Sequence, residues 1–258
     1  MRSQAPLVLL LFAACSSSAQ QGPAQQSPTP GFTEDVVETE VIASGLEHAW
    51  GVEIMPDGRF LVTERPGRLR IVSATGELSP PLTGVPAVAA SGQGGLLDVA
   101  LDPGFASNRV IYLSYAEPGQ DGTSGTAVAR ARLTDTGLAD LRVIYRQVPK
   151  VSSANHFGSR IVFRDDGTMF VTQGDRFRHR DAAQDLSSGI GKIVRIASDG
   201  SIPPDNPFVG QANARPEIWS YGHRNVQAAA INPETGALWT VGHGAAGGGE
   251  VDHPRAGK

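Results

Sequence analysis

The segment Asp165-Asp166-Gly167-Thr168-Met169-Phe170-Val171-Thr172 places a turn signal directly before a short apolar run. Asp and Gly favour tight turns, and runs of apolar and β-branched residues favour strands. Three other runs follow turn signals in the same way: Phe60-Leu61-Val62-Thr63 after Pro56-Asp57-Gly58, Val110-Ile111-Tyr112-Leu113-Ser114-Tyr115 after Asp102-Pro103-Gly104, and Leu238-Trp239-Thr240-Val241 after Pro233-Glu234-Thr235-Gly236. The runs therefore form an irregular repeat of roughly 50 to 70 residues.

This repeat predicts an all-β protein. No long window shows a convincing 3.6-residue apolar period, and the 31 Gly and 18 Pro are spread along the chain. Repeats of this size, each made of several short strands, are typical of propeller blades. A β-sandwich whose hairpins share turn chemistry is the alternative, and the spacing alone leaves it open.

The overall composition is that of an ordinary soluble globular protein. Of the 258 residues, 40% are hydrophobic and 19% are charged, with a net charge of −4. No basic patch is evident, so we expect no nucleic-acid partner.

The N-terminus predicts export. Residues 1–15 resemble a lipoprotein-type signal peptide, because an apolar run too short to span a bilayer is followed by Ala13, Ala14 and Cys15. An ordinary secretory signal with a chance cysteine is the alternative. Residues 16–35 are rich in Ser, Gln and Pro and predict a flexible tether. We therefore expect a folded domain over 36–258 that is periplasmic, lacks disulfides and contacts the membrane only through a lipid on Cys15.

Two polar clusters contain the candidate catalytic residues. His156 and Asp175 lie nineteen residues apart, beyond an intervening strand, and can form a general base with its orienting carboxylate. Arg224 and Asn225 offer cationic and amide donors that suit a planar anionic ligand. Gln93 lies in a Gly-rich turn before an apolar run, where its amide can donate to a ligand.

Several unrelated sequence words occur here in a fixed order, and together they resemble a known family. They are Asn155-His156-Phe157-Gly158-Ser159-Arg160, Gly174-Asp175, Gly191-Lys192-Ile193-Val194-Arg195-Ile196 and Ser220-Tyr221-Gly222-His223-Arg224-Asn225. From about Val41 to Lys258 the chain resembles the soluble pyrroloquinoline-quinone (PQQ) dependent aldose sugar dehydrogenases of the glucose/sorbosone dehydrogenase family. The resemblance implies a six-bladed β-propeller, of which about four blades are present, so we expect this chain to be part of a longer enzyme.

The resemblance also implies roles for individual residues. His156 matches the general base and Asp175 its support, while Gln93, Arg224 and Asn225 match residues around PQQ. Family enzymes use Ca²⁺, which needs six to eight oxygen ligands. Here the carbonyl groups of Gly244 and Ala245 match ligands of the catalytic calcium, and the side chain of Glu250 matches a second, structural calcium site. Gly249 stands where an acidic residue is expected.

The implied function is oxidation of aldose sugars at the anomeric carbon to lactones. PQQ is then the hydride acceptor, assisted by Ca²⁺, and an external electron acceptor reoxidises it. Two other functions stay open: a non-catalytic or degenerate propeller that binds carbohydrate or protein, and a calcium-dependent propeller lactonase. The altered Gly249 segment favours the first of these.

Replacing Cys15 by Ser tests the predicted lipid anchor. We expect the mature domain of Cys15→Ser to appear in the soluble fraction, because a serine cannot carry the thioether lipid. Membrane association that is unchanged on cell fractionation would contradict the lipoprotein interpretation.

Overall fold

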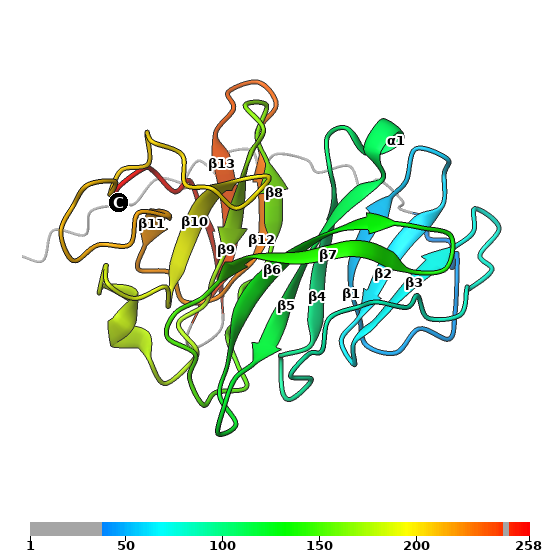
Figure 1. Ribbon diagram of the computed structural model, residues 1–258, viewed down its shortest axis with the longest axis horizontal. Coiled ribbons are helices and arrows are strands. Elements are labelled where there is room, and N and C mark those ends of the chain that lie inside the picture. Colours follow the sequence, from blue (N-terminus) through cyan, green and yellow to red (C-terminus); the bar gives the residue numbers. More distant parts are fainter. Residues whose placement is uncertain (1–37, 245–247) are drawn as a thin grey trace, which may run out of the picture. The chain divides into compact units, whose positions relative to one another are not determined.

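The chain is described by a computed structural model that covers residues 38–244 and 248–258. Almost all the regular secondary structure in this part of the chain is β-strand (Figure 1). Its helical elements are a four-residue helix, α1 (Phe105–Asn108), and a four-residue 3-10 helix, η1 (Arg180–Ala183). The predicted all-β fold class is confirmed. None of the described helices has the length and apolar character that a membrane crossing requires.

The strands form four antiparallel sheets, and every sheet follows the order of the chain. The first and second sheets consist of β1 (Ala49–Ile54), β2 (Phe60–Glu64) and β3 (Arg68–Val72), and of β4 (Leu96–Leu101), β5 (Val110–Pro118), β6 (Ser124–Leu133) and β7 (Leu138–Arg146). The third and fourth consist of β8 (Ile161–Phe163), β9 (Thr168–Thr172), β10 (Lys192–Ala197) and β11 (Ile218–Tyr221), and of β12 (Val226–Ile231), β13 (Leu238–His243) and β14 (Gly249–Asp252).

The repeat in the sequence marks the second strand of each sheet. The four predicted runs coincide with β2, β5, β9 and β13, each preceded by its turn. Each sheet is thus one meandering blade, and the four sheets account for the predicted blades.

The core lies between neighbouring sheets, so strands in the middle of the chain are buried on both faces. In β5, Ile111 and Leu113 pack into a cluster with residues of the first sheet, whereas Tyr112 packs toward Met169 and Val194 of the third sheet. A further cluster joins the third and fourth sheets. Burial on both faces explains why β5 is an apolar run rather than an alternating pattern.

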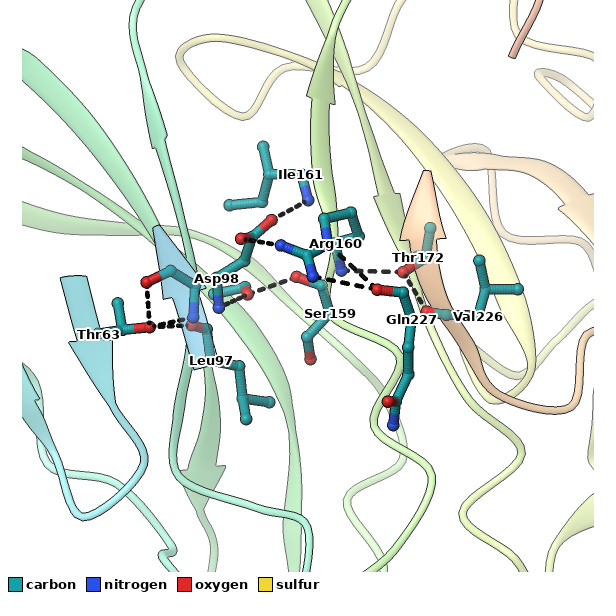
Figure 2. Close-up of polar contacts among 11 residues, drawn as sticks. Thr63, Leu97, Asp98, Ser159, Arg160, Ile161, Thr172, Val226 and Gln227 are labelled. Atoms are coloured by element: carbon teal, nitrogen blue, oxygen red, sulfur yellow. Dashed lines mark hydrogen bonds and ion pairs between the residues drawn. The ribbon is translucent and has the colours of Figure 1, made fainter. Parts of the chain in front are cut away.

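Buried hydroxyl groups link the first strand of each sheet to its neighbour. Each hydroxyl is on, or at the end of, a second strand and donates a hydrogen bond to the next sheet (Figure 2). Thr63 donates to the carbonyl oxygen of Leu97, Ser114 to that of Ser159 (2.5 Å) and Thr172 to that of Val226 (2.9 Å). The hydroxyl oxygens of Thr63, Ser114 and Thr172 also accept hydrogen bonds from backbone N–H groups of their own sheets. The donors are Gly51 (2.8 Å), Asp98 (3.0 Å) and Arg160 (2.9 Å), respectively. We call Thr63, Ser114 and Thr172 the hydroxyl staples.

Arg160 connects all four sheets at the same level. It directly precedes β8, and its guanidinium donates to the buried carboxylate of Asp98 on β4 at 2.6 Å (Figure 2). It also donates to the carbonyl oxygen of Gln227 on β12 at 3.1 Å and lies 4.4 Å from the ring centroid of Trp50 on β1. The second Asp98 oxygen accepts the N–H of Ile161 at 2.8 Å.

Acidic side chains next to Arg160 have raised pKa values. A cavity of about 430 Å³ lies beside the first strands, and Glu53, Asp98 and Arg160 line it. Burial raises the pKa of Asp98 to about 6, while Arg160 and the Ile161 N–H oppose the rise. Burial, and then the Asp98 charge, raises the pKa of Glu53 to about 7.

The staples should contribute to stability out of proportion to their size. Thr172→Val keeps the side-chain shape but leaves the Arg160 N–H and the Val226 carbonyl without this partner inside the protein. We expect a loss of about 2 kcal/mol in the free energy of unfolding, measured by urea denaturation, because buried polar groups that lose their partners are costly. Thr235→Val, at an exposed turn, is the control, and an equally small loss in both variants would contradict the role of the staple.

The raised pKa of Glu53 predicts a pH dependence of stability. Because the folded-state pKa of about 7 exceeds the ordinary value of 4.5, the folded protein binds this proton more tightly than the unfolded chain. The stabilisation is complete below the ordinary value and is lost as pH rises through about 7. The stability advantage of Glu53→Gln over the natural protein should therefore grow between about pH 5 and pH 8. The exposed Glu77→Gln is the control, and parallel curves for the natural protein and Glu53→Gln would refute the assignment.

Candidate active site

The candidate site residues meet at one end of the sheets. Gln93, His156 and Asn225 precede the first strands β4, β8 and β12, whereas Asp175 and Gly244 follow the second strands β9 and β13. In an antiparallel pair, the start of the first strand and the end of the second lie at the same edge. The meander therefore gathers at this edge polar residues that are far apart in the sequence.

The structure brings His156 and Asp175 into direct contact. The Nδ1 atom of His156 lies 2.7 Å from Oδ1 of Asp175, which is buried. The sequence predicted one intervening strand, but there are two, Ile161–Phe163 and Thr168–Thr172. The correction has a simple physical reason, since a single strand would leave the residues at opposite ends, whereas a hairpin returns the chain to where it began.

Two glycines allow this contact. A Cβ atom on Gly174 would lie 2.1 Å from the carbonyl oxygen of His156, and one on Gly158, whose φ is +63°, would lie 2.7 Å from the backbone of Gln173. Any side chain at either position would push the two backbones apart. These glycines therefore set the separation between His156 and Asp175.

Asp175 is the centre of the site's charge network. Its Oδ1 atom also accepts the N–H of Phe177 at 2.8 Å, and its Oδ2 atom accepts from the guanidinium of Arg224 at 2.5 Å. The Asp175 N–H donates to the carbonyl oxygen of Arg224 at 2.8 Å. The carboxylate thus joins the two polar clusters, which the sequence showed only as separate segments.

Gln93 and Asn225 hold the backbone on either side of the imidazole. The side-chain oxygen of Gln93 accepts the N–H of His156 at 2.8 Å, and that of Asn225 accepts the N–H of Gly158 at 3.2 Å. Both amide oxygens are therefore engaged in the protein, and the amide NH₂ groups are the parts that can face a ligand.

Buried cations next to the site bind backbone carbonyl groups. The ammonium of Lys192 donates to the carbonyl oxygens of Ala182, Ala183 and Ile190 at 2.7–3.0 Å, and burial lowers its pKa to about 8. A neighbouring histidine, His223, is partly buried beside Ser220, and this burial lowers its pKa to about 4. His223 is consequently neutral at physiological pH and supports the segment before Arg224.

The site residues predicted from the sequence leave out three residues that lie here. Phe177 is 48% exposed, and its ring lies edge-on to His156 with centroids 5.2 Å apart. Gln173 is buried, and its amide has no hydrogen-bond partner among the described residues. Arg176 is fully buried. Their position next to Asp175 is the one sequence signal that points to them, because Phe, Gln and Arg residues are otherwise common in loops.

A cavity of about 570 Å³ lies beside the segment that leads to His156. Small Ser, Thr, Gly and Ala residues form most of its wall, together with Asn155, Phe177 and Arg178. None of the predicted site residues that the structure describes lines it, and the Phe177 ring, which lies edge-on to His156, connects it to the site. The residues around it come from the second and third sheets and their connections. It is large enough to admit a sugar ring.

The segment predicted to bind metal is described only in part. The Gly244 N–H donates to the carbonyl oxygen of Gly248 at 2.9 Å, and the His243 N–H donates to that of Asn225 at 3.1 Å, so this hairpin adjoins the site. Ala245 lies outside the described residues. Glu250 is exposed on β14. Within 38–244 and 248–258, no group of three or more His, Cys, Asp or Glu side chains could hold a metal ion.

Comparison with known proteins assigns this chain to a family. Residues 46–258 match the family model described as Glucose / Sorbosone dehydrogenase. The chain belongs to the glucose/sorbosone dehydrogenase family. The matched region contains every candidate site residue, from Gln93 to Glu250.

Several named relatives and solved structures are similar to this chain. The chain is 49% identical over 225 residues to the Escherichia coli aldose sugar dehydrogenase YliI, with 86% of this chain and 60% of the relative covered. The apo structure of the soluble E. coli aldose sugar dehydrogenase superposes with a TM-score of 0.82 at 48% identity, covering 85% of this chain and 64% of that one. The PQQ-bound aldose sugar dehydrogenase of Streptomyces coelicolor gives 0.75 at 30% identity, with 85% and 63% covered. The chain thus spans about 60% of the length of the E. coli relative.

Proposed function

We propose that this protein oxidises aldose sugars with PQQ as the hydride acceptor. The observation that carries the proposal is the contact between the imidazole of His156 and the buried carboxylate of Asp175, close to a cavity lined by Asn155 and Phe177. Membership of the glucose/sorbosone dehydrogenase family and the likeness to a PQQ-bound aldose sugar dehydrogenase support it.

The residues around the pair fit an anionic quinone. Arg224 provides a partly exposed guanidinium, and Gln93 and Asn225 have NH₂ groups whose orientation is fixed by their engaged oxygens. The unpaired amide of buried Gln173 is a further donor and acceptor. Carboxylate and quinone oxygens require such donors. When bound, PQQ supplies hydride acceptance, which no side chain can provide.

His156 is the proposed general base. With Nδ1 engaged by Asp175, the Nε2 atom is available to take the proton of the sugar's anomeric hydroxyl as the C–H bond breaks. Asp175 holds the tautomer that leaves Nε2 unprotonated and stabilises the imidazolium that forms. Phe177 and the cavity provide an aromatic face and polar groups that suit a sugar ring.

Further parts of the proposal concern the metal, the product and the location. We propose a lactone product, reoxidation by an external electron acceptor, and Ca²⁺ held in part by the carbonyl groups of Gly244 and Ala245, with Glu250 near the same hairpin. Carbonyl ligands do not depend on side-chain identity, so Gly249 does not preclude them. We also propose an exported, lipid-anchored protein.

Replacing the base tests the function. In protein supplied with PQQ and Ca²⁺, His156→Ala should lower aldose-dependent dye reduction by about 10²- to 10⁴-fold, while PQQ binding, followed by absorbance, persists. The rate of dye reduction by Asp175→Asn should lie between those of the natural protein and His156→Ala, because this change disturbs the orientation of the base rather than the base itself.

The control is His48→Asn, at an exposed histidine whose left-handed backbone Asn tolerates. A near-normal kcat in His156→Ala would remove His156 from the mechanism. Turnover of lactones that needs Ca²⁺ but not PQQ would instead identify a hydrolase.

A further inference from the structure

Arg176 is an unusual residue for the interior of a protein. Its side chain is fully buried and is the largest of the fully buried side chains among the described residues. Buried arginines are normally paired with a carboxylate, yet none of the ion pairs formed within 38–244 and 248–258 includes Arg176. Burial lowers its pKa to about 10, so it stays charged at neutral pH. A buried cation of this kind needs compensating contacts.

The guanidinium of Arg176 obtains those contacts from the segment that carries His156. Its Nε donates to the carbonyl oxygen of Asn155 at 3.1 Å, and Nη2 donates to that of Ser153. The carbon of the guanidinium lies 3.6 Å from the ring centroid of Phe157. In return, the hydroxyl of Ser153 donates to the Arg176 carbonyl oxygen at 2.7 Å. One side chain therefore holds residues on both sides of His156.

The same guanidinium anchors this segment to the second sheet. Nη1 donates to the carbonyl oxygen of Ser124 at 3.2 Å, and Nη2 donates to the Ser124 hydroxyl at 3.1 Å. Ser124 begins β6, a strand that belongs to a different blade from β8 and β9. These hydrogen bonds therefore fix the His156 segment relative to a strand of the second sheet rather than to a loop.

The backbone at His156, and directly after Asp175, has an unfavourable conformation that the contacts of Arg176 support. His156, Arg176 and Phe177 have φ values of +54°, +56° and +63°. Bulky residues rarely adopt left-handed backbone, and they keep it only where surrounding contacts enforce it. Because Arg176 directly follows Asp175 in the chain, its hydrogen bonds fix the positions of both His156 and Asp175.

We propose that Arg176 is the positioning residue of this site, holding the 153–157 backbone so that the imidazole of His156 meets Asp175. Because its side chain is fully buried, Arg176 acts through the backbone that it holds. Its effect on catalysis rests on the proposed function of His156, whereas its effect on the His156–Asp175 contact does not.

Nuclear magnetic resonance of the unliganded protein tests this contact directly. The Nδ1 proton shared by His156 and Asp175 should give a strongly downfield signal, assigned by its loss in His156→Asn. Arg176→Met removes the donors but keeps a long apolar side chain, and we expect that signal to disappear or broaden into exchange with water. The control Arg164→Met removes an arginine that also lies over an aromatic ring, Phe170 at 5.8 Å, and should leave the signal unchanged.

A conservative variant covers the case in which Arg176→Met does not fold. Arg176→Lys keeps the charge but loses the planar fork, so it should give a folded protein with a weakened, faster-exchanging signal. A signal at the natural position and intensity in either folded variant would overturn the proposal.

Catalysis provides a second, separable readout. In protein with PQQ and Ca²⁺, Arg176→Lys should lower kcat by about 10²-fold, as expected for a misplacement of about 1 Å, with a much smaller change in the KM for glucose. A change confined to KM would overturn the positioning role. If the natural protein oxidises no aldose while the proton signal responds as described, the proposed function fails and the positioning role of Arg176 stands.

Discussion

The contact between the first strands of neighbouring sheets is the constraint on which the rest of the structure depends. Each sheet is too small to be stable alone, since an isolated meander of a few strands has no core of its own. Apolar faces supply the adhesion, but they do not fix the register. The hydroxyl staples and the Asp98–Arg160 pair do so, because a buried polar group tolerates no sliding away from its partner. Figure 2 shows these directional contacts at one level across the sheets.

The register between the sheets determines the positions of the site residues relative to one another. The staple Thr172 holds the N–H of Arg160 and the carbonyl oxygen of Val226, each only a few residues from His156 and Asn225. Groups on different sheets thereby approach within hydrogen-bonding distance at the ends of the strands. Two glycines without side chains then let the backbones cross closely enough for the His156–Asp175 contact.

Charge is distributed unevenly around the site. Arg176 and Lys192 are buried and bind carbonyl oxygens, and the carboxylate of Asp175 is the negative group between His156 and Arg224. Carbonyl dipoles stabilise a cation without cancelling its charge, whereas a carboxylate partner would neutralise it. The arrangement keeps cationic groups close to where an anionic cofactor is proposed to bind.

Much of this could be predicted because it is written in local sequence. The turn signals before Phe60, Val110, Met169 and Leu238 located the second strand of each sheet, since turn chemistry and strand preference act over a few residues. The words around His156 and Arg224 indicated the candidate site and its family. The number of strands between His156 and Asp175 was wrong, because β8 has only three residues and leaves little pattern to recognise.

The sequence by itself determined the all-β repeat, the order of the blades and the chemical types at the site, because these depend on neighbours along the chain. Only the tertiary structure decided that Asp175 bridges His156 and Arg224, that Gln93 holds the His156 backbone, and that Arg176 is buried. Those facts depend on segments 19 to 63 positions apart, whose approach is set by packing between sheets. An arginine in a loop reads the same in sequence whether water or a carbonyl cage surrounds it, and only the packed sheets distinguish the two.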